Sequence, residues 1–245
     1  MIRRPLIALL LLAACGLAAQ PTEKKNPSDE APDNTDPQLW SRLLEINERS
    51  RKIQDLSADF RQEKHTAMLK RPLVSTGTVL VRGDAMRWDT SAPEPTVMLI
   101  TEGEVRIYYP QQKVMEIFRV DQQLASLAAS PLPRLSVLRE HFHFEPLDVR
   151  EIDEDADATR TLAVRLIPRH ETLAEHITAV RVLLDADAGY IMAFEMIDAD
   201  EDRTVIRFSD VKANTNIGPE AFELDLPRDV TITRPLERME SGRRG

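Results

Sequence analysis

The chain has little of three things on which many binding proteins depend: cysteine, aromatic side chains and an excess of positive charge. One cysteine among 245 residues excludes an internal disulfide bond. Aromatic residues make up only 5% of the chain, so the core must consist mainly of aliphatic side chains. The formal net charge of −9 provides no basic surplus, and such a surplus supplies most of the affinity of nucleic-acid-binding proteins. These absences favour a protein with no nucleic-acid partner and a core that needs no disulfide.

Motifs of catalysis and of metal binding are also missing. The chain contains no Gly-Xaa-Ser-Xaa-Gly elbow, no phosphate-binding loop and no paired His-Glu motif. His141 and His143 would share a face on a strand, but no other histidine has the spacing of a third ligand. The acidic stretch 153–157 resembles the start of a calcium loop without the glycine and glutamate that complete it. We therefore predict no enzymatic activity, no metal site and no cofactor.

The beginning of the chain has the layout of an export signal. Arg3 and Arg4 precede an apolar run from Leu6 to Ala14. This run is about half the length that a bilayer-spanning helix needs. A charged start followed by a short apolar run is typical of a secretory signal. We therefore predict a signal peptide over residues 1–14.

The single cysteine stands at the end of this run. Leu12-Ala13-Ala14-Cys15 resembles the bacterial lipobox, in which the cysteine becomes the acylated N-terminus. The alternative is ordinary cleavage after Ala19, without a lipid. Residues 20–35 are polar and contain three prolines, so they cannot fold alone. We predict a lipid anchor at Cys15 on a disordered linker over residues 15–35, which reaches at most about 70 Å.

Beyond the linker, the spacing of apolar residues predicts one helix and then many short strands. Asp36-Pro37 is a typical helix start, with an N-cap acceptor followed by proline. Apolar residues then recur at helical steps until the spacing changes to two after Gln54. Turn residues, Gly77 among them, separate the alternating segments. This pattern predicts an antiparallel sheet or an open barrel. The alternating residues are Leu56, Ala58, Phe60, Val79, Val81, Met86, Trp88, Val105, Ile107, Val180, Val182 and Leu184.

One segment in the middle of the chain interrupts the alternation. Leu124 and Leu127 have helical spacing within residues 120–129, and Leu135 and Leu138 form a second short helical pattern. Two interpretations remain open. The helices are either a fixed plug that hides the apolar side of an open sheet, or a lid that moves.

Four segments in this order resemble the LolA-type outer-membrane lipoprotein carriers. Ala58 to Glu63 resembles the family's Ala-Xaa-Phe-Xaa-Gln strand, and Gly77 to Trp88 resembles its Arg-Pro-Gly-Xaa-Phe-Arg-Trp hairpin. Thr101 to Pro110 resembles its Asp-Gly segment. The closing pattern, a strand followed by Phe and then Pro, is resembled by Ile206 to Val211, Asn216, and Phe222 to Pro227. The likeness extends from about Leu39 to Ile232. It departs from the family at the hairpin, where Gly83, Asp84 and Met86 replace proline, glycine and phenylalanine.

The resemblance implies a mainly β (α+β) fold. A single curved antiparallel sheet would form an open half-barrel, covered by an N-terminal helix and two short mid-chain lid helices. The lipoprotein-binding domain would span residues 36–235, and residues 236–245 would be a disordered tail. The cavity would take acyl chains, which need only apolar area, worth about 0.8 kcal/mol per buried CH₂. The expected lining, each residue of which is equally an ordinary core residue, is Met86, Trp88, Met98, Ile100, Leu124, Leu127, Leu135 and Leu138.

Arg82 matches the family's arginine at the hairpin, which is thought to hydrogen-bond the lid helices in the closed state. Asp84 is placed to pair with Arg82 and weaken this lock. The alternative for Arg82 is a surface arginine at a strand end. The implied partners are acylated lipoproteins, an inner-membrane lipoprotein-releasing complex and an outer-membrane acceptor, for a monomer in the periplasm of a Gram-negative-type envelope.

The lipobox is the main departure from that family, whose members normally move freely between membranes. A carrier with its own anchor cannot cross a gap wider than its tether. Three functions therefore remain open: a periplasmic carrier or chaperone, a membrane-anchored LolB-like receptor, and an envelope sensor that binds lipid or protein without transferring it.

Overall fold

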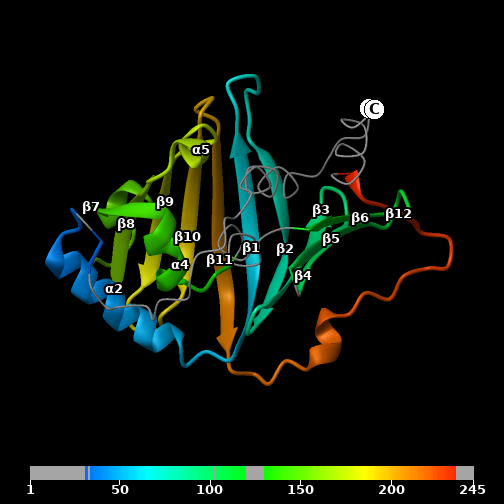
Figure 1. The fold of residues 1–245 in the computed structure, drawn as a ribbon, viewed down its shortest axis with the longest axis horizontal. Coiled ribbons are helices and arrows are strands. Elements are labelled where there is room, and N and C mark those ends of the chain that lie inside the picture. Colours follow the sequence, from blue (N-terminus) through cyan, green and yellow to red (C-terminus); the bar gives the residue numbers. More distant parts are fainter. Residues whose placement is uncertain (1–30, 33, 102, 120–129, 236–245) are drawn as a thin grey trace.

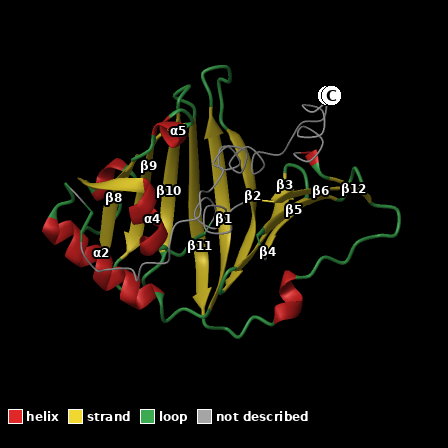
Figure 2. Ribbon diagram, in the orientation of Figure 1, coloured by secondary structure: helices red, strands yellow, loops and turns green. Residues whose placement is uncertain are grey.

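Twelve strands form one curved, open sheet, with the helices concentrated on one side (Figures 1 and 2). The computed structural model describes residues 31–32, 34–101, 103–119 and 130–235. The strand order across the sheet is β12-β6-β5-β4-β3-β2-β1-β11-β10-β9-β8-β7, so the first and last long strands of the chain meet at its centre.

The elements follow one another mostly as a meander. The first half contains α2 (Pro37–Ser50), β1 (Asp55–His65), β2 (Leu73–Arg82), β3 (Ala85–Ala92), β4 (Thr96–Thr101), β5 (Glu104–Tyr109) and β6 (Val114–Arg119). The second half contains α4 (Leu135–His141), β7 (Phe142–Leu147), η1 (Val149–Glu151), β8 (Thr161–Pro168), α5 (Glu171–Ala174), β9 (Ile177–Asp185), β10 (Ile191–Asp198), β11 (Arg203–Ala213), η2 (Pro219–Phe222) and β12 (Thr231–Thr233).

This architecture confirms the predicted mainly β fold with an open half-barrel, and one edge differs from a purely antiparallel sheet. β12 pairs with β6 in parallel, with Thr231 opposite Val114. The chain reaches this edge after passing β4 to β6 on the face of the sheet that does not carry α2 and α4 (Figure 1). There Leu224 and Leu226 pack against Tyr108 and its neighbours. Because the chain arrives by this long crossover and not by a hairpin, it can run in the direction of β6.

The predicted helix start is confirmed at α2. The Asp36 side chain accepts hydrogen bonds from the backbone N–H groups of Gln38 and Leu39, both at 2.8 Å, and Pro37 occupies the first helical turn. The buried stripe of α2 faces the sheet, and the Trp40 ring meets Phe144 of β7 edge-on, with 5.4 Å between ring centroids. α2 therefore covers the end of the sheet formed by β7 to β10.

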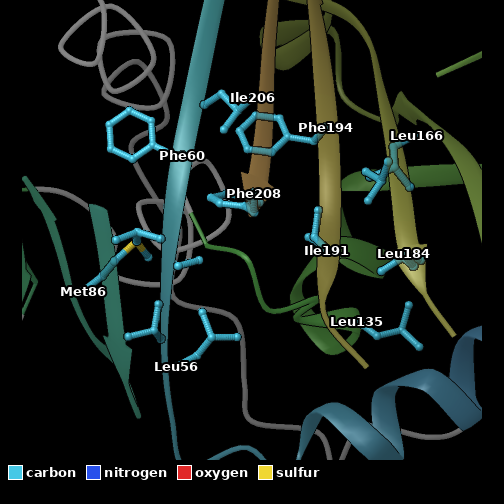
Figure 3. Packing of buried hydrophobic residues seen from close by; sticks show 14 of the residues in the cluster. Leu56, Phe60, Met86, Leu135, Leu166, Leu184, Ile191, Phe194, Ile206 and Phe208 are labelled. Carbon is cyan, nitrogen blue, oxygen red and sulfur yellow. The ribbon is translucent and has the colours of Figure 1, made fainter. Parts of the chain in front are cut away.

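The alternation of apolar residues gives the sheet one continuous apolar face. We call the face that carries α2 and α4 the inner face. Paired residues on neighbouring strands share a face, so Phe60, Phe208, Phe194 and Ile206 all lie on it (Figure 3). They belong to a single core cluster that also contains residues of α2 and α4. The rings of Phe60, Phe194 and Phe208 therefore lie together near the centre of the sheet.

The interpretation of Gly77 as a turn was wrong. Gly77 lies inside β2, where the register between β2 and β3 shifts between Thr76 and Gly77. A Cβ atom at this position would lie 2.0 Å from the Asp89 carbonyl oxygen and 2.9 Å from the Phe60 ring. Glycine is present because the neighbouring strand and the Phe60 ring approach the backbone too closely for any side chain.

The two histidines of the His-Phe-His motif do not share a strand. His141 is the last residue of α4, and His143 lies in β7, which begins directly after the helix. The change from helical to extended backbone between them removes the period of two on which the shared face depended. In the part of the chain that the structure describes, no group of three potential metal ligands is present.

Candidate functional site: an apolar cavity under two helices

A small apolar cavity of about 20 Å³ lies between α2, α4 and strands β7 to β10. A space of this size holds about one water molecule. Figure 3 shows Leu135 of α4 beside Leu184 and Ile191 of the sheet. The lining consists of Leu43, Ile46, Asn47, Pro133, Leu135, Leu138, Phe144, Val164, Leu166, Val182, Leu184 and Ile191.

The lining contains no ionisable side chain, and Asn47 is its one polar member. Next to Ile191, burial raises the pKa of the Tyr190 phenol, and the Asp185 carboxylate raises it further. Tyr190 is therefore neutral at physiological pH. Such a cavity offers apolar contact and no group for acid–base chemistry.

The segment that leads into α4 is attached to the sheet at two places. The Ile191 backbone N–H donates to the Pro131 carbonyl at 2.7 Å. The Arg134 guanidinium donates to the Gly83 carbonyl at 2.7 Å and to the Asp84 carboxylate at 2.5 Å. These contacts tie residues 130–134 to the start of β10 and to the turn between β2 and β3.

α4 is held by apolar contacts and, at its C-terminal end, by the residues that follow β8. The Arg169 backbone N–H donates to the His141 carbonyl at 2.9 Å, and the Arg169 guanidinium donates to the Arg139 carbonyl at 3.0 Å.

The seven residues of α4 bury Leu135 and Val137, and its N-cap residue makes no capping hydrogen bond through its side chain. The Arg139 guanidinium lies 5.9 Å from the centre of the Trp40 ring on α2. A helix this short is not stable by itself, so its position depends on the sheet, on α2 and on the Arg134 and Arg169 contacts.

Two of the predicted lining residues, Leu135 and Leu138, line the cavity. Leu124 and Leu127 lie outside the described residues, as does Cys15. The first predicted lid helix therefore lies outside the described part of the chain, and α4 is the second.

The other predicted lining residues lie on the same face but not at the cavity. Met86 pairs with Ile100, and Trp88 pairs with Met98, on β3 and β4. All four are at most 2% exposed and belong to the core cluster that also lines the cavity. The Trp88 ring packs against Phe60, 4.3 Å between centroids. These residues extend the apolar inner face toward β6.

The structure places Arg82 and Asp84 differently from the predicted pair. Arg82 is exposed at the end of β2, and none of the hydrogen bonds between described residues involves its side chain. The Asp84 carboxylate is instead bound by Arg134, from the segment before α4. The hairpin turn is thus connected to the α4 segment through an arginine that the sequence analysis did not single out.

Most of the cavity lining also escaped the sequence analysis. The helical spacing after Pro37 predicted a helix but not that Leu43 and Ile46 face a cavity. Val182 and Leu184 carried the signal of alternation, but alternation alone does not separate a cavity wall from filled core. Phe144 follows the misinterpreted His-Phe-His motif. The missing information was which strands α2 and α4 cover.

Among residues 31–32, 34–101, 103–119 and 130–235, no helix combines the length and the apolar composition of a bilayer span. Large apolar side chains are nevertheless exposed at the turn between β1 and β2, where Met68 is 93% exposed.

The open sheet, its apolar inner face and the cavity without ionisable side chains under α2 and α4 together offer a ligand apolar contact. The chain belongs to the family described as outer membrane lipoprotein carrier protein LolA, whose model matches residues 51–225. This confirms the family to which the four sequence segments pointed.

Two curated outer-membrane lipoprotein carrier proteins are similar to this chain in sequence. The outer-membrane lipoprotein carrier protein of Pseudomonas syringae pv. syringae is 26% identical over 205 residues, 82% of this chain and 90% of the relative. That of Pseudomonas fluorescens is 27% identical over 206 residues, 81% of this chain and 89% of the relative.

The solved structures are more distant. The crystal structure of MucB aligns with a TM-score of 0.49 at 14% identity, over 78% of this chain and 64% of that protein, so this chain spans less than two thirds of MucB. The LolA superfamily protein NE2245 from Nitrosomonas europaea aligns with a TM-score of 0.41 at 13% identity, over 76% and 97%.

Proposed function

We propose that this protein is an envelope lipoprotein carrier or chaperone, which binds the acyl chains of lipoproteins on its inner face and delivers them to the outer membrane. The observation that supports this most is the continuous apolar inner face with a cavity under α2 and α4. Membership of the carrier family supports the same ligand class. The partners would be acylated lipoproteins, a releasing complex of the inner membrane and an acceptor at the outer membrane, with the protein acting as a monomer in the periplasm and without enzymatic activity.

Of the two interpretations of the mid-chain helices, we propose the lid, because acyl-chain binding needs more space than the closed structure offers. A space of about 20 Å³ is far too small for an acyl chain. Binding therefore requires α4 to move away from β8 to β10 and expose the lining. The seven-residue α4 is attached through the contacts of Arg134 and Arg169, which are fewer than the hydrogen bonds of the continuous ladders between the strands, so moving it is less costly than opening the sheet.

Native mass spectrometry of the chain after co-expression with an acylated lipoprotein tests the proposal. A matched lipoprotein whose acylated cysteine is replaced by alanine is the control. We expect a complex with the acylated lipoprotein and no complex with the variant that lacks the acylated cysteine. Equal recovery of both, or of neither, would contradict acyl-chain binding and favour a structural role.

The lipobox supports a second candidate, a membrane-anchored LolB-like receptor. If Cys15 is acylated, a tether of at most about 70 Å limits the protein to one membrane surface. Intact mass of the membrane-extracted protein decides between the two: a lipid-modified Cys15 favours the receptor, and cleavage after Ala19 without lipid favours the soluble carrier. An assay of transfer between two sets of vesicles separates both from a sensor, which would bind acylated lipoprotein but move none of it.

A further inference from the structure

A glutamine is buried without a hydrogen-bond partner in the middle of the apolar inner face. Gln62 of β1 is 0% exposed. Neither its Nε2 nor its Oε1 has a hydrogen-bond partner among the residues that the structure describes. Buried amides are almost always paired, because an unpaired one destabilises the folded state. An unpaired amide on the ligand-binding face is therefore a group that a ligand can satisfy.

The register of the sheet connects Gln62 to the cavity. Gln62 pairs with Ile206, Ile206 pairs with Phe194, and Phe194 pairs with Val182 of the cavity lining. Neighbouring strands lie about 4.8 Å apart, so these three steps span about 14 Å. Ile206 and Phe194 give this path an apolar floor, which Figure 3 shows between Phe60 and Leu184. A chain that enters the cavity and follows this path ends beside Gln62.

The face becomes more polar beyond Gln62. Ser75, opposite Gln62 on β2, is buried, and so is Thr90 on β3, whose hydroxyl has no partner among the described residues. The next residue of β1 on the same face, Lys64, forms an ion pair with Asp202 at 3.6 Å. The inner face therefore changes, along β1, from apolar at Leu56 to polar at Gln62 and charged at Lys64.

We infer that Gln62 binds the carbonyl groups at the head of a diacyl ligand, through a hydrogen bond from its Nε2, and so fixes the direction in which the ligand lies. The acyl chains would extend from Gln62 over Ile206 and Phe194 to the cavity, and the polar head would face Lys64. This inference rests on the proposed function and adds to it the chemical group that is recognised: an ester or amide carbonyl next to the acyl chains. Acylated lipoproteins and glycerophospholipids share that group.

Two matched ligand pairs test the inference. The first pair is a diacylglyceryl lipopeptide and its diether analogue, which has the same chains without ester carbonyls. The second pair is phosphatidylglycerol and its diether analogue. Affinities of both pairs are measured for the full chain, for Gln62→Met, which keeps the length of the side chain without the amide, and for Gln111→Met, a control at an exposed glutamine of the turn between β5 and β6.

We expect the unmodified chain and Gln111→Met to prefer the diester by about fivefold, as one hydrogen bond predicts. Gln62→Met should bind the diether as well as the unmodified chain does and lose the preference. A preference within the lipopeptide pair alone identifies lipoproteins as the source of the carbonyl, and one within both pairs shows that phospholipid is also recognised.

Equal affinity of the unmodified chain for diester and diether, or an unchanged preference in Gln62→Met, would overturn the inference and leave acyl-chain binding intact. Failure to bind any of the four ligands would overturn the proposed function itself. If Gln62→Met does not fold, nuclear magnetic resonance of the unmodified chain replaces it. The Gln62 side-chain amide signal should then shift with the diester and not with the diether, and equal shifts would contradict the inference.

Discussion

Arg134 and Asp84, fifty residues apart in the chain, form an ion pair that joins the segment before α4 to the turn between β2 and β3. The same guanidinium donates to the Gly83 carbonyl at 2.7 Å, so one side chain holds both a charge and a backbone group of the turn. The Arg134 side chain is 22% exposed and that of Asp84 is 69% exposed. The pair is open to solvent and therefore weak enough to break during ligand binding.

Arg134→Ala should loosen α4 in the ligand-free protein. Loss of the pair and of the carbonyl contact should cost about 1 kcal/mol, or about fivefold faster amide exchange over residues 135–141. Because the closed state is weakened, acyl-chain affinity should rise by a similar factor. Hydrogen exchange and ligand titration measure the two effects.

Arg160→Ala is the matched control for this change. Arg160 and Asp187 form an ion pair of 3.4 Å between exposed side chains of the loop before β8 and the turn between β9 and β10, and no hydrogen bond or ion pair joins either of them to the described residues of α4. Its removal should leave the exchange of α4 unchanged. If Arg134→Ala and Arg160→Ala have the same effect on α4, the Arg134 contacts do not hold the helix.

Arg82→Leu should slow the hand-over of a bound lipoprotein while the fold stays intact. The expected effect rests on the family resemblance, which gives this arginine a role in the closed state, because none of the hydrogen bonds between described residues involves its side chain. Arg82 is exposed, so circular dichroism and thermal unfolding should match those of the unmodified chain. Transfer kinetics that do not change would show that Arg82 is a surface arginine without a role in closing.

Val182→Phe should fill the cavity and block the chains. Val182 lines the cavity and is 5% exposed, so a larger ring has no route to solvent. We expect at least about a tenfold loss of acyl-chain affinity, with a destabilisation of about 1–3 kcal/mol from overpacking. Ligand titration and urea unfolding measure the two quantities.

Val205→Phe separates blocking from general damage. Val205 is equally buried but pairs with Glu63 and Glu195 on the opposite face of the sheet. This variant should lose a similar amount of stability and keep its affinity. A comparable loss of affinity in both variants would mean that the cavity is not where the chains bind.

Gly77→Ala should destabilise the protein by more than about 3 kcal/mol, because the added Cβ would overlap the Asp89 carbonyl. Gly83→Ala should cost only about 1 kcal/mol: its φ of +56° is unfavourable for alanine, but no atom lies within 4 Å of the added Cβ. Urea unfolding of both variants tests the difference. Similar midpoints would contradict the close approach at Gly77.

The sequence by itself determined the class of fold and the family. Alternating residues such as Val79 and Val81 predicted strands because successive side chains of a strand point to opposite faces. Asp36-Pro37 predicted the start of α2 because capping acts over a few residues. Both signals are local, so they can be interpreted without knowing which distant segments pack against these residues. The ordered motifs then placed the chain in its family, as the match over residues 51–225 confirmed.

Only the tertiary structure decided which residues of the inner face come together. Met86 and Leu135 are both large apolar residues that were predicted to line the cavity. Only Leu135 does so, because α4 covers β8 to β10 and not β3. The partner of Asp84 is distant Arg134, and Gly77 is required by a backbone from another strand. The unpaired amide of Gln62 likewise arises from the register of β1 with β2 and β11. These relationships depend on the packing of segments far apart in the chain, which no local pattern specifies.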